Sequence, residues 1–154
     1  MSRISAAVLA GGVLLVSSCG TPPRATPVKR GPMPVNASFD RTWDAAIDAF
    51  AHWNVPVQNR DKKAGTLSSF GVVVTGADST WADCGRTQGG DAGRPQLPQV
   101  GRYVGTVKGD SVSSSIFVET LWMSGTGMVI KECISRGIWE TQFEQEVKSK
   151  AEQH

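Results

Sequence analysis

The sequence predicts an α+β domain, in which an N-terminal and a C-terminal helix pack on one face of a curved antiparallel sheet of about five strands. Three observations lead to this prediction. Apolar residues recur at helical spacing after Ser38 and again over Ile138 to Glu152. Between these two segments lie five short runs with strand character, and turn sequences separate several of them.

The first 18 residues have the pattern of a secretory signal peptide. Arg3 forms a short positive region, and an uncharged, mainly apolar run follows from Ile4 to Val16. This run is shorter than the roughly 20 apolar residues that cross a bilayer. Its length fits the apolar region of a signal peptide, so we expect segment 1–18 to direct export and then to be removed. No second apolar run of comparable length follows, so we expect the rest of the chain to be soluble.

The end of this segment, Val16-Ser17-Ser18-Cys19, resembles the lipobox of bacterial lipoproteins. The resemblance implies a diacylglyceryl group on the Cys19 sulfur, cleavage before Cys19, and a fatty acyl group such as palmitate on the new amine. Two or more acyl chains anchor a protein stably to a membrane. Gly20 stands where an aspartate would favour the inner membrane, which points to the outer membrane. A plain secretory signal with a chance cysteine is the alternative.

Residues 19–36 are expected to form a lipidated, proline-rich tether. Segment 20–36 holds five of the eight prolines and three basic residues with no acidic one, and such composition favours an extended chain. The domain at 37–154 carries 12 Lys and Arg against 14 Asp and Glu, and we expect no nucleic-acid partner. Val28 to Val35 can also supply a first edge strand, because proline is tolerated there.

The first helix is predicted to begin after Ser38, a residue type favoured at the N-cap. Its apolar stripe has spacings of three and four and consists of Phe39, Trp43, Ala46, Ile47 and Phe50. Pro56 and the alternation of Val55 and Val57 are expected to end the helix and begin a strand.

The five strand-like runs are Val55–Gln58, Thr66–Val74, Gly101–Val107, Val112–Met123 and Met128–Cys133. Turns are predicted at residues 62–65, 109–110 and 125–127, which are rich in glycine. In the longest run, one face is expected to be buried, and it consists of Val112, Ser114, Ile116, Val118, Thr120 and Trp122. Phe117 and Leu121 point the other way.

The segment Thr75 to Gln99 is predicted to be a long glycine-rich loop. With Cys19 lipidated, Cys84 in this loop and Cys133 remain as a pair in an oxidising compartment, where a disulfide is expected. The bond would tie the loop to the domain. Two free thiols are the alternative.

The C-terminal helix is predicted over about Ile138 to Glu152. Its apolar stripe consists of Trp139, Phe143, Val147 and Ala151. Two pairs at spacing four, Glu144 with Lys148 and Glu146 with Lys150, have the charge order that stabilises a helix.

No catalytic set, metal site or cofactor site is expected. Asp40, Asp44 and Asp48 align on one face of the first helix, but a solvated polar face explains them better than a cation site. His52 and His154 are the only histidines, and no G-x-S-x-G motif or Walker lysine is present. We therefore expect the protein not to be an enzyme.

The five tryptophans divide into two groups. Trp43, Trp122 and Trp139 fall on predicted buried faces, so they are expected in the core. Trp53 and Trp81 fall at a helix end and in the long loop, and they are the candidate partner surface because aromatic residues dominate binding hot spots.

Two segments, FDRTWDAAIDAFAHWNVPV at 39–57 and CISRGIWETQFEQEV at 133–147, resemble small bacterial outer-membrane lipoproteins with helix-grip domains, such as the C lipoprotein of the β-barrel assembly machine. This resemblance implies a non-enzymatic accessory or scaffolding role in the cell envelope, facing the periplasm and binding another envelope component. A carrier of a small apolar ligand is the alternative, because a curved sheet closed by helices can enclose an apolar pocket.

Overall fold

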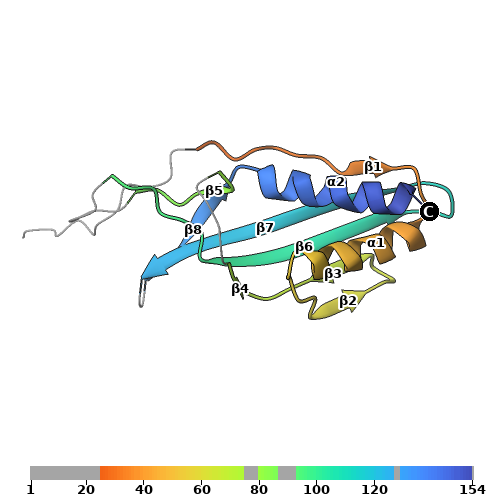
Figure 1. The fold of residues 1–154 in the computed structure, drawn as a ribbon, viewed down its shortest axis with the longest axis horizontal. Coiled ribbons are helices and arrows are strands. Elements are labelled where there is room, and N and C mark those ends of the chain that lie inside the picture. The colour runs from red at the N-terminus through yellow and green to blue at the C-terminus, as the bar shows by residue number, and fades with distance from the viewer. Residues whose placement is uncertain (1–24, 75–79, 87–92, 127–128, 154) are drawn as a thin grey trace, which may run out of the picture.

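The computed structural model describes residues 25–74, 80–86, 93–126 and 129–153. The predicted signal peptide and Cys19 lie outside these residues. The described chain forms two helices and eight strands, β1 Met33–Val35, α1 Phe39–His52, β2 Asn59–Asp61, β3 Thr66–Ser68, β4 Val72–Val73, β5 Ala82–Asp83, β6 Val100–Gly109, β7 Ser114–Thr126, β8 Val129–Ser135 and α2 Ile138–Glu152 (Figure 1).

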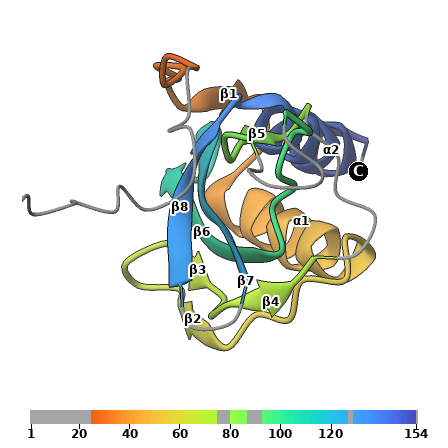
Figure 2. The ribbon, with the colours of Figure 1, turned by 90° about the vertical axis from the view of Figure 1, so that its left-hand side faces the viewer.

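The strands form an antiparallel sheet in the order β2-β3-β6-β7-β8-β5, with β1 added to β7 and β4 added to β6. Figure 2 shows both helices side by side within the curve of this sheet, on one face. The predicted α+β class is confirmed, but the predicted number of about five strands is wrong. Sequence periodicity missed β4 and β5 as separate strands, because each has only two residues, which is too short to show alternation. β1 lies within the edge strand that Val28 to Val35 was expected to supply.

The long hairpin of β6 and β7 is the centre of the sheet. Its register pairs Val100 with Met123 at one end and Gly109 with Ser114 at the other. The predicted turn between them is confirmed, since the Asp110 N–H donates to the Ser113 carbonyl oxygen at 2.9 Å. The inward face matches the prediction in part, because the strand residues Ser114, Ile116, Val118 and Trp122 are buried and Thr120 is partly buried. Val112 was also predicted to be buried, but it is 76% exposed, because it lies in the turn before β7 begins.

Two predicted strands need correction. Val55–Gln58 is not a strand, because β2 begins at Asn59 and the proline at 56 has no N–H to donate to a neighbouring strand. The run predicted at Thr66–Val74 is divided into β3 and β4, both paired with β6. Ser68 pairs with Val104, and Val72 pairs with Gly101. Between these two pairings, residues 69–71 lie opposite residues 102–103 of β6, so the chain has one extra residue there and forms a bulge.

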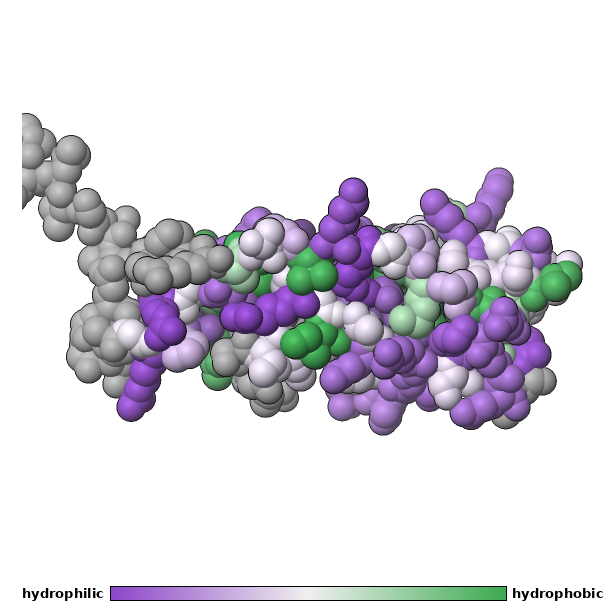
Figure 3. All heavy atoms as spheres, turned by 90° about the horizontal axis from the view of Figure 1, so that it is seen from above, coloured by the Kyte–Doolittle hydropathy of each residue, from purple (hydrophilic) through white to green (hydrophobic). Residues whose placement is uncertain are grey.

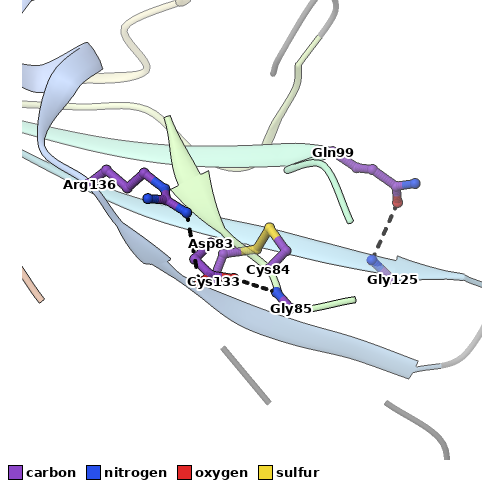
Figure 4. The surroundings of a disulfide bond; sticks show 7 residues. All are labelled: Asp83, Cys84, Gly85, Gln99, Gly125, Cys133 and Arg136. Atoms are coloured by element: carbon purple, nitrogen blue, oxygen red, sulfur yellow. Dashed lines mark hydrogen bonds and ion pairs between the residues drawn. A yellow bond between two sulfur atoms is a disulfide. The ribbon is translucent and has the colours of Figure 1, made fainter. Parts of the chain in front are cut away.

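The loop predicted at 75–99 contains a strand. Within its described part, β5 pairs with the end of β8, and the Cys84–Cys133 disulfide joins the two segments beside this pairing (Figure 4). The predicted disulfide is thus present. Asp83 supports the same corner, because its carboxylate accepts a hydrogen bond from the Gly85 N–H at 2.8 Å and lies 3.9 Å from Arg136.

The core between helices and sheet is a continuous row of aromatic rings. Trp139 of α2 is central, with ring centroids 4.7 Å from Tyr103, 5.3 Å from Phe143 and 5.9 Å from Trp122. Phe50 of α1 extends the row, because its ring lies 4.6 Å from Phe143. The predicted apolar stripes of both helices therefore meet in one cluster.

Residues 25–35, assigned to the tether from sequence, lie along α2 and β7, and we call this segment the strap. The Arg30 guanidinium pairs with the buried Glu144 carboxylate and donates to the Val118 carbonyl oxygen at 3.0 Å. Glu144 in turn accepts the Val118 N–H at 2.7 Å. Arg30 and Glu144 thus satisfy both outward backbone groups of Val118, in the stretch of β7 between its pairing with β1 and its pairing with β8.

The strap also corrects one predicted ion pair. Glu146 pairs with Lys150 at 3.4 Å as predicted, but Glu144 is turned into the protein toward Arg30. Lys148 binds instead to Glu152 and to the Pro34 carbonyl oxygen of the strap, both at 2.8 Å. Burial raises the pKa of Glu144, even though Arg30 and the Val118 N–H lower it.

Candidate functional site

The two tryptophans predicted as a partner surface lie at one cavity, although 28 positions separate them in the chain. This cavity, called here the tryptophan cavity, has a volume of about 360 Å³. Its lining consists of His52, Trp53, Asn54, Val55, Val72, Val73, Val74, Trp81, Tyr103 and Trp139. It is therefore built from the end of α1, the β4 region, the start of β5, β6 and α2.

Trp53 is held at the cavity by the way α1 ends. The Trp53 N–H donates to the Ala49 carbonyl oxygen, and Asn54 then adopts a positive φ of 54° that turns the chain away from the helix. The indole Nε1 donates to the Glu146 carboxylate at 2.8 Å, and the ring meets Trp139 edge-on at 5.3 Å. A hydrogen bond and a ring contact thus orient the Trp53 side chain.

Trp81 is held at the other side of the cavity by the corner around β5. Its carbonyl oxygen accepts the Arg136 N–H at 2.9 Å, and its ring lies 5.6 Å from that of Trp122. The disulfide at Cys84 is three residues further along the chain. The bond that closes the loop therefore also positions Trp81.

Apart from His52 and Asn54, the remaining walls are apolar or aromatic. Tyr103 and Trp139 are buried, and the three valines of the β4 region are partly exposed at the rim, with Val73 at 75%. Burial, together with the charge of Glu140, raises the pKa of Tyr103 above its ordinary value, so its phenol stays neutral. Such walls suit an apolar or aromatic group rather than an ion.

Glu146 gathers polar side chains beside the cavity. Its Oε1 lies 2.8 Å from His52 Nδ1 and 3.4 Å from Lys150, while Oε2 accepts the indole N–H of Trp53. Partial burial disfavours the charge of Glu146, but these contacts outweigh it and lower the pKa of the carboxyl. In the described part of the chain, His52 is exposed and pairs with this glutamate and not with a serine. This cluster orients Trp53.

The aligned aspartates of α1 remain on its outer face. Asp40 pairs with Lys62 at 2.8 Å, and Asp44 and Asp48 are exposed. Among the residues that the structure describes, no group of three His, Cys, Asp or Glu side chains is arranged to hold a metal ion. His154 lies outside the described residues.

No protein-family model matches the chain, and no curated protein matches it. None of the helices in the described ranges has both the length and the apolar character needed to span a membrane.

Several residues of the tryptophan cavity were missed by sequence reasoning. Tyr103 was assigned only to a strand, and the β4 valines were read as the end of one longer strand. Glu146 was identified only as the partner of Lys150. A signal for Tyr103 does exist, because it is the only tyrosine in the sequence and the only aromatic residue of its strand.

Proposed function

We propose that this chain is a lipid-anchored protein of the cell envelope that binds an apolar group of another envelope component in the tryptophan cavity, without catalysing a reaction. The lipobox-like segment ending at Cys19 and the resemblance to helix-grip lipoproteins support the setting, with the outer membrane as the anchoring site and the periplasm as the compartment. The meeting of Trp53 and Trp81 at one cavity carries the binding role.

The size and the walls of the cavity support a bound group of limited extent. Ligand pockets usually measure about 300–1,000 Å³, and this cavity is near the lower limit. Tryptophan side chains at a partly exposed site are the residue type that contributes most to hot spots. The cavity therefore suits an apolar or aromatic side chain of a partner protein inserted between Trp53 and Trp81.

A carrier of a small apolar ligand is the second candidate function. A specific observation favours it, because Trp53 and Trp81 line a hollow rather than a flat surface patch. The two candidates share the cavity and differ in the mass of what it holds.

The anchor is tested by a Cys19→Ala variant. We expect it to appear in the soluble fraction after cell fractionation, because the sulfur that would carry the diacylglyceryl group is gone. The unmodified chain is expected in the membrane fraction, and mass spectrometry of its N-terminal peptide should show the acyl groups. Membrane association of the variant equal to that of the unmodified chain would contradict the anchor.

The binding role is tested by placing a photoreactive phenylalanine analogue at Val73, on the cavity rim, and separately at Ile130 on β8, which is similarly exposed and does not line the cavity. Irradiation of cells is expected to give a discrete adduct from position 73 that decreases at least fivefold when Trp81→Ala is added. Position 130 should give no adduct of that mass.

The mass of the adduct separates the candidates. An increase by the mass of a protein supports the accessory role, and an increase of less than about 1 kDa supports the carrier. Adducts at position 73 that are insensitive to Trp81→Ala, or identical adducts from both positions, would contradict binding in the tryptophan cavity.

A further inference from the structure

A second cavity, of about 320 Å³, lies between the strap, β7 and the beginning of α2, and we call it the strap cavity. The strap contributes Val28, Lys29 and Arg30, β7 contributes residues 117–120, and the third wall consists of Ser135, Gly137 and Glu140. Figure 3, which views the molecule from above Figure 1, shows a largely hydrophilic surface with only small hydrophobic areas. Six of the ten residues that line the strap cavity are polar or charged, so the cavity suits a polar ligand.

Glu140 is the residue that indicates what this ligand is. It is only 2% exposed, and the Ser135 hydroxyl donates to its Oε1 at 2.6 Å. The same hydroxyl accepts the Gly137 N–H at 3.1 Å, which ties the glutamate to the N-terminus of α2. One carboxylate oxygen is therefore held in place, while Oε2 has no hydrogen-bond partner among the described residues.

A buried carboxylate oxygen without a partner is unfavourable, so Oε2 of Glu140, a residue that lines the strap cavity, indicates a missing donor. Thr120 adds a second unmatched atom, because its Oγ1 is buried, lacks a partner in the described part of the chain, and belongs to the same lining. Both oxygens can accept a hydrogen bond. Glu140 Oε2 belongs to a carboxylate, whereas Thr120 Oγ1 belongs to a neutral hydroxyl.

The charge balance of the cavity favours a cationic donor. The Arg30 guanidinium lines the same cavity but forms its ion pair with Glu144, and Glu140 has no ion-pair partner among the described residues. Glu119 adds a further carboxylate to the lining, and Lys29 is the remaining basic residue of the strap wall, with an exposed side chain. A primary ammonium group has three N–H donors and no acceptor, which matches two acceptor oxygens and an uncompensated negative charge.

We propose that the strap cavity binds the ammonium group of a small primary amine, with Glu140 Oε2 and Thr120 Oγ1 as its acceptors. Val28 and Phe117 provide apolar contacts for a short alkyl chain beside the ammonium group. Because the strap forms one wall, ligand binding stabilises the docked strap. This proposal is independent of what occupies the tryptophan cavity.

The test is calorimetric titration of the purified full-length protein, in detergent micelles at pH 7, with n-propylammonium chloride. We expect saturable 1:1 binding, and at least tenfold weaker binding of tetramethylammonium, which has the charge but no N–H donor. Glu140→Gln should weaken propylammonium binding at least tenfold, and Thr120→Val should weaken it about threefold. Glu132→Gln, an exposed glutamate of β8 outside the lining, is the matched control and should change nothing.

Thermal unfolding of each variant shows whether it is folded, and Thr120→Val serves as the readout if Glu140→Gln unfolds. Three outcomes would overturn the proposal. The first is no saturable binding to the unmodified protein, which leaves water as the donor. The second is equal affinity for tetramethylammonium. The third is binding only after Lys29→Met, which would show that the Lys29 ammonium group itself occupies the site.

Discussion

Replacing Cys84 and Cys133 together by alanine should lower the free energy of unfolding by about 4 kcal/mol. The disulfide joins residues 49 apart in sequence, and in the chain-entropy model the loss of a cross-link of this span destabilises the folded state by about that amount. Both cysteines are buried, so alanine leaves small voids that add to the loss. Urea denaturation followed by tryptophan fluorescence measures the change.

Reduction of the unmodified protein provides the control for this prediction. Dithiothreitol should destabilise the unmodified protein to nearly the same extent and should leave the double alanine variant unaffected. Because the bond holds the β5 corner that positions Trp81, the double variant should also lose the adduct at position 73. A loss of stability below about 1 kcal/mol would show that the chain does not depend on this cross-link.

Arg30→Met should lower the free energy of unfolding at pH 7 by about 3 kcal/mol, because it leaves the Glu144 carboxylate buried without its cation. The strap would also lose its hydrogen bond to the Val118 carbonyl oxygen. Lys148→Met is the matched control. Lys148 also binds the strap, through the Pro34 carbonyl oxygen, but its partly exposed contacts should contribute less than about 1 kcal/mol.

The loss of stability caused by Arg30→Met should be larger at pH 7 than near pH 4. Burial already raises the pKa of Glu144 above its ordinary value of 4.5, and removal of Arg30 raises it further. A carboxyl whose pKa is higher in the folded than in the unfolded protein destabilises the folded state fully when the pH is above its folded-state pKa. When the pH is below its unfolded-state pKa, the carboxyl is protonated in both states and no longer destabilises the folded state. The destabilisation should therefore be complete at pH 7 and should shrink as the pH falls toward 4.

A double variant separates the ion pair from the packing. Arg30→Met combined with Glu144→Leu removes both charges, and it should recover part of the stability that the single variant loses at pH 7. Recovery will be incomplete, because Glu144 also accepts the Val118 N–H. A loss that is the same at pH 4 and pH 7 would mean that the Glu144 charge is not its cause.

The elements that sequence reasoning predicted correctly depend on neighbours in the chain. Ser38 does cap α1, where its hydroxyl accepts the Arg41 N–H, and α2 has the predicted bounds. The β6–β7 hairpin follows from two alternating runs joined by a turn of glycine and aspartate. The disulfide was predictable for a different reason, since the assignment of Cys19 to lipidation leaves only one pair to form.

Other features depended on contacts between distant segments. Strands of two or three residues such as β4 and β5 exist because a longer neighbour offers free backbone groups, which no local pattern reports. The sequence paired Glu144 with Lys148 along the helix, whereas the strap covers Glu144 and supplies Arg30 as its partner. A buried carboxylate and an exposed one have the same sequence pattern when the covering segment lies more than 100 residues away.

The sequence alone determined the two-helix, antiparallel α+β class and the pairing of two cysteines, because apolar periodicity, turn residues and cysteine parity are local or countable properties. Only the tertiary structure decided that Trp53 and Trp81 line one cavity, and that Glu140 and Glu144 are buried beneath the strap. The physical reason is that burial depends on which segments meet when the sheet curves around both helices. Each of the two candidate binding cavities is lined by segments that lie far apart in the sequence.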